Sequence, residues 1–301
     1  MEEYIDDLLR RMADEETEIW HRAYDEAKAL NDLLTFPYLQ QKVIKAKKVS
    51  MKKDIYYLMT KLAINTKEIY IADYLIDRLE CEQIPTLLSE LLSNIYTLPE
   101  VSSTNKIIPY IYHKNDSVRY WAVASLKLYK SLEAESALLK LLDTEENKDE
   151  ITHICYTLLE IGTKQSILPL TKLLYSNSVY VRSTVIEVLA KIGGSDLQIV
   201  YIEALHDRNV MVKYEAVRAI YTYGDEMAMR AICERVNKIV ARRRKNEVEI
   251  IIALRFLHKF ANHEEVLKIF DKVYKKRGNL FMSEREWLRD NITYFQEKES
   301  M

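Results

Sequence analysis

The sequence predicts an all-α protein, a right-handed α-solenoid of about eight stacked helix pairs. Three glycines, Gly162, Gly193 and Gly224, stand 31 residues apart, and each closes an apolar segment. The 301 residues include only five Gly and five Pro, which leaves little room for β-turns. A fixed period of this size without strand signals is typical of helical repeats, which bury their apolar faces against their neighbours. We therefore expect a single domain over residues 1–301.

The second helix of each repeat carries the clearest pattern, because several positions recur together when segments are aligned on the glycines. Apolar columns spaced by four and three residues lie on one helix face. The columns are Ala122, Ile154, Val185 and Ala216; Leu126, Leu158, Leu189 and Ile220; and Tyr129, Ile161, Ile192 and Tyr223. We expect all three columns in the core, followed by glycines in the left-handed conformation that ends a helix.

The first helices are weaker in pattern. They are expected at residues 107–113, 136–142, 167–175 and 197–206. Polar residues that precede the second helices are candidate N-caps, because their side-chain oxygens can accept from backbone N–H groups that lack a partner in the helix. These candidates are Asp116, Asn177 or Ser178, and Asn209.

The ends of the array are expected to differ from its middle, because a terminal repeat has one face in water. We assign residues 1–50 to N-terminal capping helices and residues 51–240 to repeats, clearest over 105–226. Residues 241–301 are expected to form a basic connection and C-terminal capping repeats.

The repeats share a Val-Arg or Val-Lys pair, small residues after it and an Ile-Gly or similar ending. The matching strings are Val118-Arg119 with Ala122, Val181-Arg182 with Ile192-Gly193, and Val212-Lys213 with Ala216 and Gly224. These units resemble HEAT repeats, particularly the short bacterial HEAT-like repeats of the PBS-lyase type. In that family an Asp in the turn often pairs with the Arg or Lys six residues later. Only Asp207 with Lys213 keeps that spacing, because His113 and Ser176 stand at the equivalent positions, so a ladder of ion pairs between repeats is not predicted.

The composition indicates a folded protein of a reducing compartment. The net charge of −2 provides no global attraction to nucleic acid or acidic membranes. The three cysteines, Cys81, Cys155 and Cys233, lie apart in apolar stretches and are expected to be buried free thiols. No stretch reaches the roughly 20 apolar residues that a membrane helix needs. We expect a cytoplasmic protein, and we favour a monomer.

The residue patterns indicate no catalytic site, metal or cofactor. The six histidines do not form a metal-ligand spacing, and no glycine-rich phosphate loop, nucleophile elbow or Cys-x-x-Cys motif is present. Deoxyhypusine hydroxylases are HEAT-repeat enzymes that hold a di-iron centre with several His-Glu pairs. This chain has one such pair, His263-Glu264. We therefore predict that the protein is not an enzyme.

A basic segment near the C-terminus suggests one candidate function. It comprises Lys238, Arg242, Arg243, Arg244, Lys245, Lys275, Lys276 and Arg277. Stacked on one ridge, these side chains could neutralise phosphates of DNA or RNA. The fold class is also that of alkylpurine DNA glycosylases of HEAT-like type. Alternatively, the segment is only a solvated charged face.

A second candidate function is recognition of a protein partner. Tyrosine is abundant, with 21 residues, and Tyr and Arg are enriched in protein interfaces. The candidate contact strip on the concave surface is Arg119, Tyr120, Arg182, Lys213 and Tyr214. The Arg column could instead tie neighbouring repeats together. We expect a non-catalytic scaffold or adaptor that binds a protein, with nucleic-acid binding as the alternative.

Overall fold

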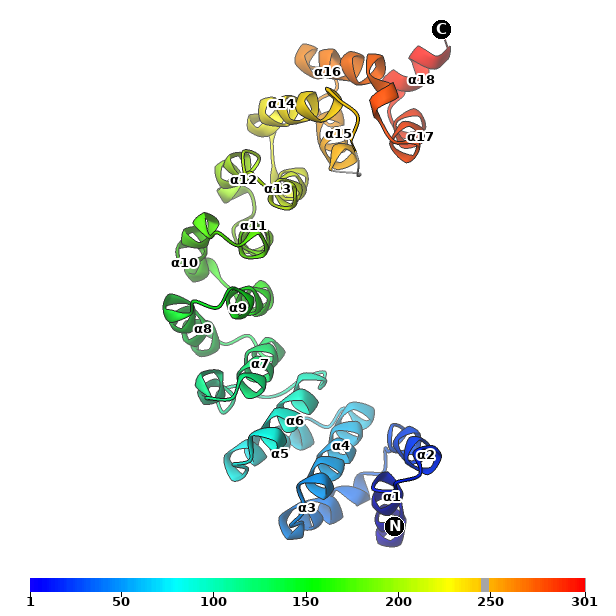
Figure 1. Cartoon of the computed structure of the whole chain (residues 1–301), viewed down its shortest axis with the longest axis vertical. Coiled ribbons are helices and arrows are strands. Elements are labelled where there is room, and N and C mark those ends of the chain that lie inside the picture. Colours follow the sequence, from blue (N-terminus) through cyan, green and yellow to red (C-terminus); the bar gives the residue numbers. More distant parts are fainter. Residues whose placement is uncertain (245–248, 301) are drawn as a thin grey trace. The chain divides into compact units, whose positions relative to one another are not determined.

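The computed structural model describes residues 1–244 and 249–300, and over these residues it contains helices and no strand. This confirms the predicted all-α class. The chain divides into two compact units, Met1–Gly162 and Thr163–Met301. Each unit is a stack of helix pairs (Figure 1).

In the first unit, each of the second helices α4, α6, α7 and α9 packs against the next, and α3, α5, η3 and α8 cover their other side (Figure 1). Two further helices, α1 and α2, pack on each other at the N-terminal end. The bounds are α1 Glu2–Met12, α2 Thr17–Ala27, α3 Phe36–Lys45, α4 Val49–Thr66, α5 Ile69–Arg78, α6 Pro85–Tyr96, η3 Ile108–Tyr112, α7 Asp116–Ser125, α8 Leu132–Thr144 and α9 Lys148–Ile161.

The second unit repeats this arrangement. The second helices α11, α13, α15 and α17 form one layer, and α10, α12, α14 and α16 form the other, with α18 packed on α16 and α17. The bounds are α10 Ile167–Lys172, α11 Val179–Gly193, α12 Gln198–Ala204, α13 Val210–Tyr223, α14 Met229–Val240, α15 Ile250–His258, α16 Glu264–Lys275, α17 Met282–Asn291 and α18 Thr293–Ser300.

Two of the three predicted core columns are confirmed. The columns that begin at Ala122 and Leu126 are buried throughout. The third is wrong for its tyrosines, because Tyr129 is 44% and Tyr223 37% exposed. Tyr129 follows a 3-10 turn with an extended backbone and so leaves the face of α7, and Tyr223 is the last residue of α13. The apolar period does not indicate where a helix ends, and the exposure of these two tyrosines depends on their place at helix ends.

The glycines end helices for a different reason from the one predicted. Gly162 and Gly224 have extended backbones, with φ of −62° and −79°, and among the described glycines the left-handed φ belongs to Gly194. At Gly224 the constraint is space. A Cβ atom there would lie 2.6 Å from the carbonyl oxygen of Ile220, which is backbone and cannot rotate away.

Replacing Gly224 by alanine is expected to destabilise the second unit by about 1–3 kcal/mol, because the added methyl forces the chain away from Ile220. The matched control is Gly278→Ala, where a Cβ meets nothing within 4 Å and the change should stay within about 0.5 kcal/mol. Urea unfolding of both variants checks this. Equal effects would show that space at Gly224 is not the constraint.

The predicted caps and cysteines are partly confirmed. Ser178 and Asn209 cap α11 and α13 with their side chains, whereas Asn115, not Asp116, caps α7. Cys155 and Cys233 are buried free thiols, but Cys81 is exposed, because it lies at the end of the short 3-10 helix that follows α5. Within the described part of the chain, no helix has both the length and the apolar character to cross a membrane.

Candidate partner-binding surface

The arginine of α11 ties two successive repeats together. Arg182 is only 4% exposed and donates through Nε and Nη2 to both carboxylate oxygens of Asp207, at 2.7 and 3.0 Å. Its Nη1 donates to the carbonyl oxygen of Ser176 at 2.7 Å. The paired, buried guanidinium is therefore not available to a partner, which removes Arg182 from the predicted contact strip.

Arg119 does the same in the first unit. Its guanidinium contacts the Glu150 carboxylate, with an Nη2–Oε1 distance of 2.5 Å, and donates to the carbonyl oxygen of His113 at 3.0 Å. Ion pairs therefore tie these repeats together, which is the alternative that the sequence left open for the Arg column, although the acids are not the ones six residues before each arginine. The acid comes from the following repeat, and the position six residues before each arginine contributes its backbone carbonyl, which any residue type can supply.

The Arg182–Asp207 pair makes stability depend on pH. Burial raises the pKa of Asp207, but hydrogen bonds from Arg182 and the Asn209 N–H outweigh it and hold the pKa below its usual range. A carboxyl group whose pKa is lower in the folded state than in the unfolded state, where it is about 3.9, stabilises the fold fully at pH values above 3.9. This stabilisation is lost as the pH falls through the pKa of the folded state.

Replacing Asp207 by asparagine is therefore expected to destabilise the second unit by about 1–3 kcal/mol at neutral pH, and the penalty should shrink as the pH falls below the ordinary carboxyl pKa. Urea unfolding of the wild type and the variant across this range measures the difference. A penalty that stays constant with pH would show that the Asp207 charge contributes nothing.

A partly exposed aromatic pair lies on the layer of second helices in the first unit. The rings of Tyr120 on α7 and His153 on α9 stack, with centroids 4.1 Å apart and planes inclined by 11°. His153 Nε2 lies 3.0 Å from the carbonyl oxygen of Tyr120. Tyr120 is nevertheless 50% exposed. The sequence predicted Tyr120 as a contact but missed His153. The available signal was its position 33 residues after Tyr120, about one repeat later, which places the two side chains on neighbouring helices.

Burial lowers the pKa of His153, and the hydrogen bond to the Tyr120 carbonyl only partly offsets this. The ring is therefore neutral at physiological pH and acts as a flat, largely apolar surface. The pair forms part of a groove of about 270 Å³ between α7 and α9, whose lining is mainly apolar. Val123 and Ile154 line the groove, and so do five polar or charged residues, Asp116, Arg119, Asn147, Asp149 and Glu150.

Tyr214 on α13 holds the position equivalent to Tyr120 and is also exposed. Lys213 beside it is half-buried. Burial and the nearby Arg235 lower the pKa of Lys213, against the attraction of Glu249 and Asp207. Of the five residues in the predicted strip, the two tyrosines are therefore the ones whose side chains face solvent most freely.

The predicted basic ridge is partly engaged in internal contacts. Arg244 is mostly buried in an ion pair with Glu284. Lys275 pairs with Asp271 at 2.5 Å and Arg277 donates to the carbonyl oxygen of Tyr274 at 2.9 Å, but both side chains remain exposed. Lys238, Arg242, Arg243 and Lys276 are also exposed, and Lys245 lies outside the described residues. The segment therefore includes internal ion pairs as well as solvated charges.

Comparisons with known proteins agree with this architecture. The family model for HEAT repeats matches residues 167–253, which overlap the repeats predicted over 105–226 and extend beyond them. No curated protein matches the chain.

Two solved structures are similar to the chain. A crystal structure of an engineered protein aligns over 99% of this chain and 88% of its own, at 16% identity and a TM-score of 0.54, which shows a common fold. The complex of CpcE and CpcF of phycocyanin lyase from Nostoc sp. PCC7120 covers 79% of this chain and 94% of its own, at 16% identity and a TM-score of 0.44. The described part of the chain is thus an all-helical repeat protein, and its residues 167–253 match the model of the HEAT-repeat family.

Proposed function

We propose that this protein is a non-catalytic interaction module that binds a protein partner through the exposed aromatic side chains of its second helices. In the first unit the contact centres on Tyr120 and His153 and the groove between α7 and α9. In the second unit Tyr214, with Lys213 beside it, is the equivalent contact.

The observation that carries this proposal is the stacked, half-exposed Tyr120 ring, which lines a groove together with the apolar Val123 and Ile154. A tyrosine offers a large contact area with few rotatable bonds, which is why interface hot spots are rich in Tyr. Here His153 already holds the ring on one face, so less side-chain entropy is lost on binding. The groove beside it gives a partner's apolar side chain a place to be buried.

Replacing Tyr120 by alanine is expected to weaken partner binding by about 2 kcal/mol, roughly thirtyfold, without loss of folding. The matched control is Tyr175→Ala, because Tyr175 is 90% exposed but follows α10, in the layer of first helices. The partner is first captured from native lysate on the tagged wild type, with and without nuclease. It is then titrated against both variants by calorimetry.

Three results would discriminate between the candidate functions. A protein that survives nuclease and loses affinity with Tyr120→Ala but not Tyr175→Ala supports the proposal. A protein that both variants bind equally well places the contact elsewhere. Nucleic acid in the untreated sample, with every captured protein lost after digestion, would favour the nucleic-acid alternative through Arg242 and Arg243.

A further inference from the structure

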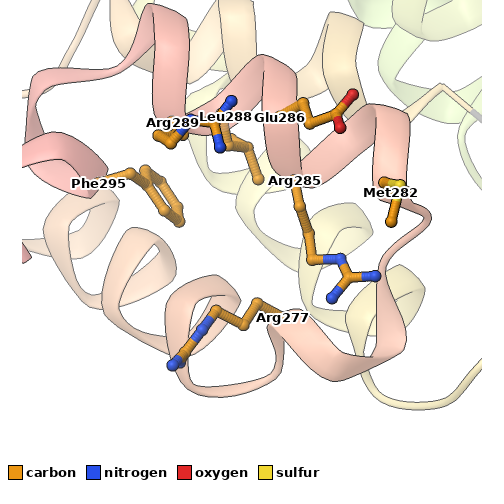
Figure 2. A pocket seen from close by; sticks show the side chains of 7 residues that line it. All are labelled: Arg277, Met282, Arg285, Glu286, Leu288, Arg289 and Phe295. Carbon is orange, nitrogen blue, oxygen red and sulfur yellow. The ribbon is translucent and has the colours of Figure 1, made fainter. Parts of the chain in front are cut away.

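A second cavity, of about 290 Å³, lies near the end of the second unit, away from the aromatic pair in sequence and in unit. Figure 2 shows its lining, which comes from α17, α18 and the turn after α16. Three arginines, Arg277, Arg285 and Arg289, line it together with the apolar Met282, Leu288 and Phe295. The cavity thus combines concentrated positive charge with an apolar wall.

The positive charge of the three arginines is only partly balanced, although Glu286 also lines the cavity. Arg289 pairs with Asp290 at 2.9 Å, and Arg277 lies over the Tyr274 ring, 4.2 Å from its centroid. Arg285 is exposed and has no hydrogen-bond or ion-pair partner in the described part of the chain. The nearby acid, Glu286, directs its carboxylate away from the space that Arg285 enters (Figure 2). Because a guanidinium stays charged at any physiological pH, the cavity carries a standing attraction for an anion.

The apolar wall limits what that anion can be. Leu288 and Phe295 are buried, and Phe295 faces the open space beside Arg285 and Arg277 in Figure 2. Arginine binds a carboxylate through two parallel N–H donors, while the neighbouring wall can bury one apolar group. A volume of about 290 Å³ has room for one large apolar side chain and its carboxylate.

We propose that this cavity binds the C-terminal carboxylate of a partner protein whose last side chain is apolar, with Arg285 as the main carboxylate contact. The site is separate from the Tyr120 surface and goes beyond the function proposed for it. A nucleic acid fits less well. Its phosphates could be neutralised by exposed cations, but its backbone would leave the apolar wall of the cavity without a matching group.

The test uses methyl NMR on the full chain with ¹³C-labelled methionine, since Met282 lies in the cavity wall. The Met282 signal is assigned with Met282→Leu. The probes are an acetylated Gly-Ser-Gly-Phe peptide with a free carboxylate, the same peptide as a carboxamide, inorganic phosphate and a single-stranded oligothymidylate. Arg285→Gln is compared with Arg230→Gln, whose arginine is exposed on α14 of the same unit and pairs with Glu234.

We expect the free carboxylate peptide to shift the Met282 signal saturably, and the carboxamide to bind at least about tenfold more weakly. Arg285→Gln should cause a similar loss, and Arg230→Gln should not. Equal binding of carboxylate and carboxamide, or no shift at the solubility limit, would overturn the proposal. Tighter binding of phosphate or oligothymidylate than of the peptide would also overturn it, in favour of a phosphate site.

Discussion

Replacing Glu82 by alanine is expected to destabilise the first unit by about 3–5 kcal/mol, because it removes the one acid from a mostly buried group of polar side chains. Glu82 is 4% exposed and accepts from Lys52 at 2.8 Å and from the hydroxyl of the fully buried Tyr56 at 2.6 Å. Arg78 reaches the same carboxylate at 3.2 Å. Without Glu82, two cations with little access to water lose their counter-charge.

Hydrogen exchange followed by mass spectrometry of peptides from α4 and α6 measures this loss locally, which suits a repeat chain whose unfolding need not be a single step. The matched control is Glu80→Ala, because Glu80 is exposed and pairs with Lys106, which is also exposed. That change should stay within about 0.5 kcal/mol. A Glu82→Ala effect as small as this would mean that the group contributes nothing net.

Reversing the charge of Arg244 is the second change with a large expected effect. Arg244→Glu should destabilise the end of the second unit by more than about 3 kcal/mol, because its guanidinium is the partner of Glu284, which is 1% exposed. Glu284 also accepts from the backbone N–H of Phe281 at 3.0 Å, and so holds the start of α17. Two carboxylates facing each other there would repel without access to water.

The exchange rates of α17 amides measure this effect, and the double variant Arg244→Glu with Glu284→Arg should recover part of the stability. Arg243→Glu is the control, because Arg243 is exposed. Its Nε donates a long hydrogen bond, of 3.3 Å, to the Gly278 carbonyl oxygen, so little stability should be lost with it. If Arg244→Glu leaves α17 unchanged, the buried pair is not a determinant of this end. Loss of nucleic-acid binding is therefore informative only for Arg243→Glu, where folding should be kept.

Much of the fold could be predicted from the sequence because it depends on local periodicity. Apolar residues at spacings of three and four define a helix face wherever they occur, so the columns through Leu126 and Leu158 are buried as predicted. The period also stops being informative where helices end, and the tyrosines Tyr129 and Tyr223 at those ends were placed in the core wrongly. Whether side chains of a helix's last turn are buried depends on what the next segment packs against.

The candidate site was less predictable, because it depends on contacts between repeats. Arg119 and Arg182 looked like partner contacts, but their carboxylate partners lie 31 and 25 residues later in the chain and only packing brings them together. The same holds for His153, whose ring completes a surface with Tyr120. Residue spacing within one helix does not report such pairs.

The all-α array of helix pairs with a period of about 31 residues could be predicted from the sequence, because periodicity, few glycines and few prolines are local properties. Which polar and aromatic side chains remain available depends on contacts between segments that are far apart in the chain. Glu284, which is 40 residues after Arg244 in the sequence, pairs with it and so neutralises one charge of the basic segment. The guanidinium of Arg285, in contrast, has no partner in the described part of the chain. Packing against another repeat, rather than residue type, decides whether a charge is neutralised or open to a ligand.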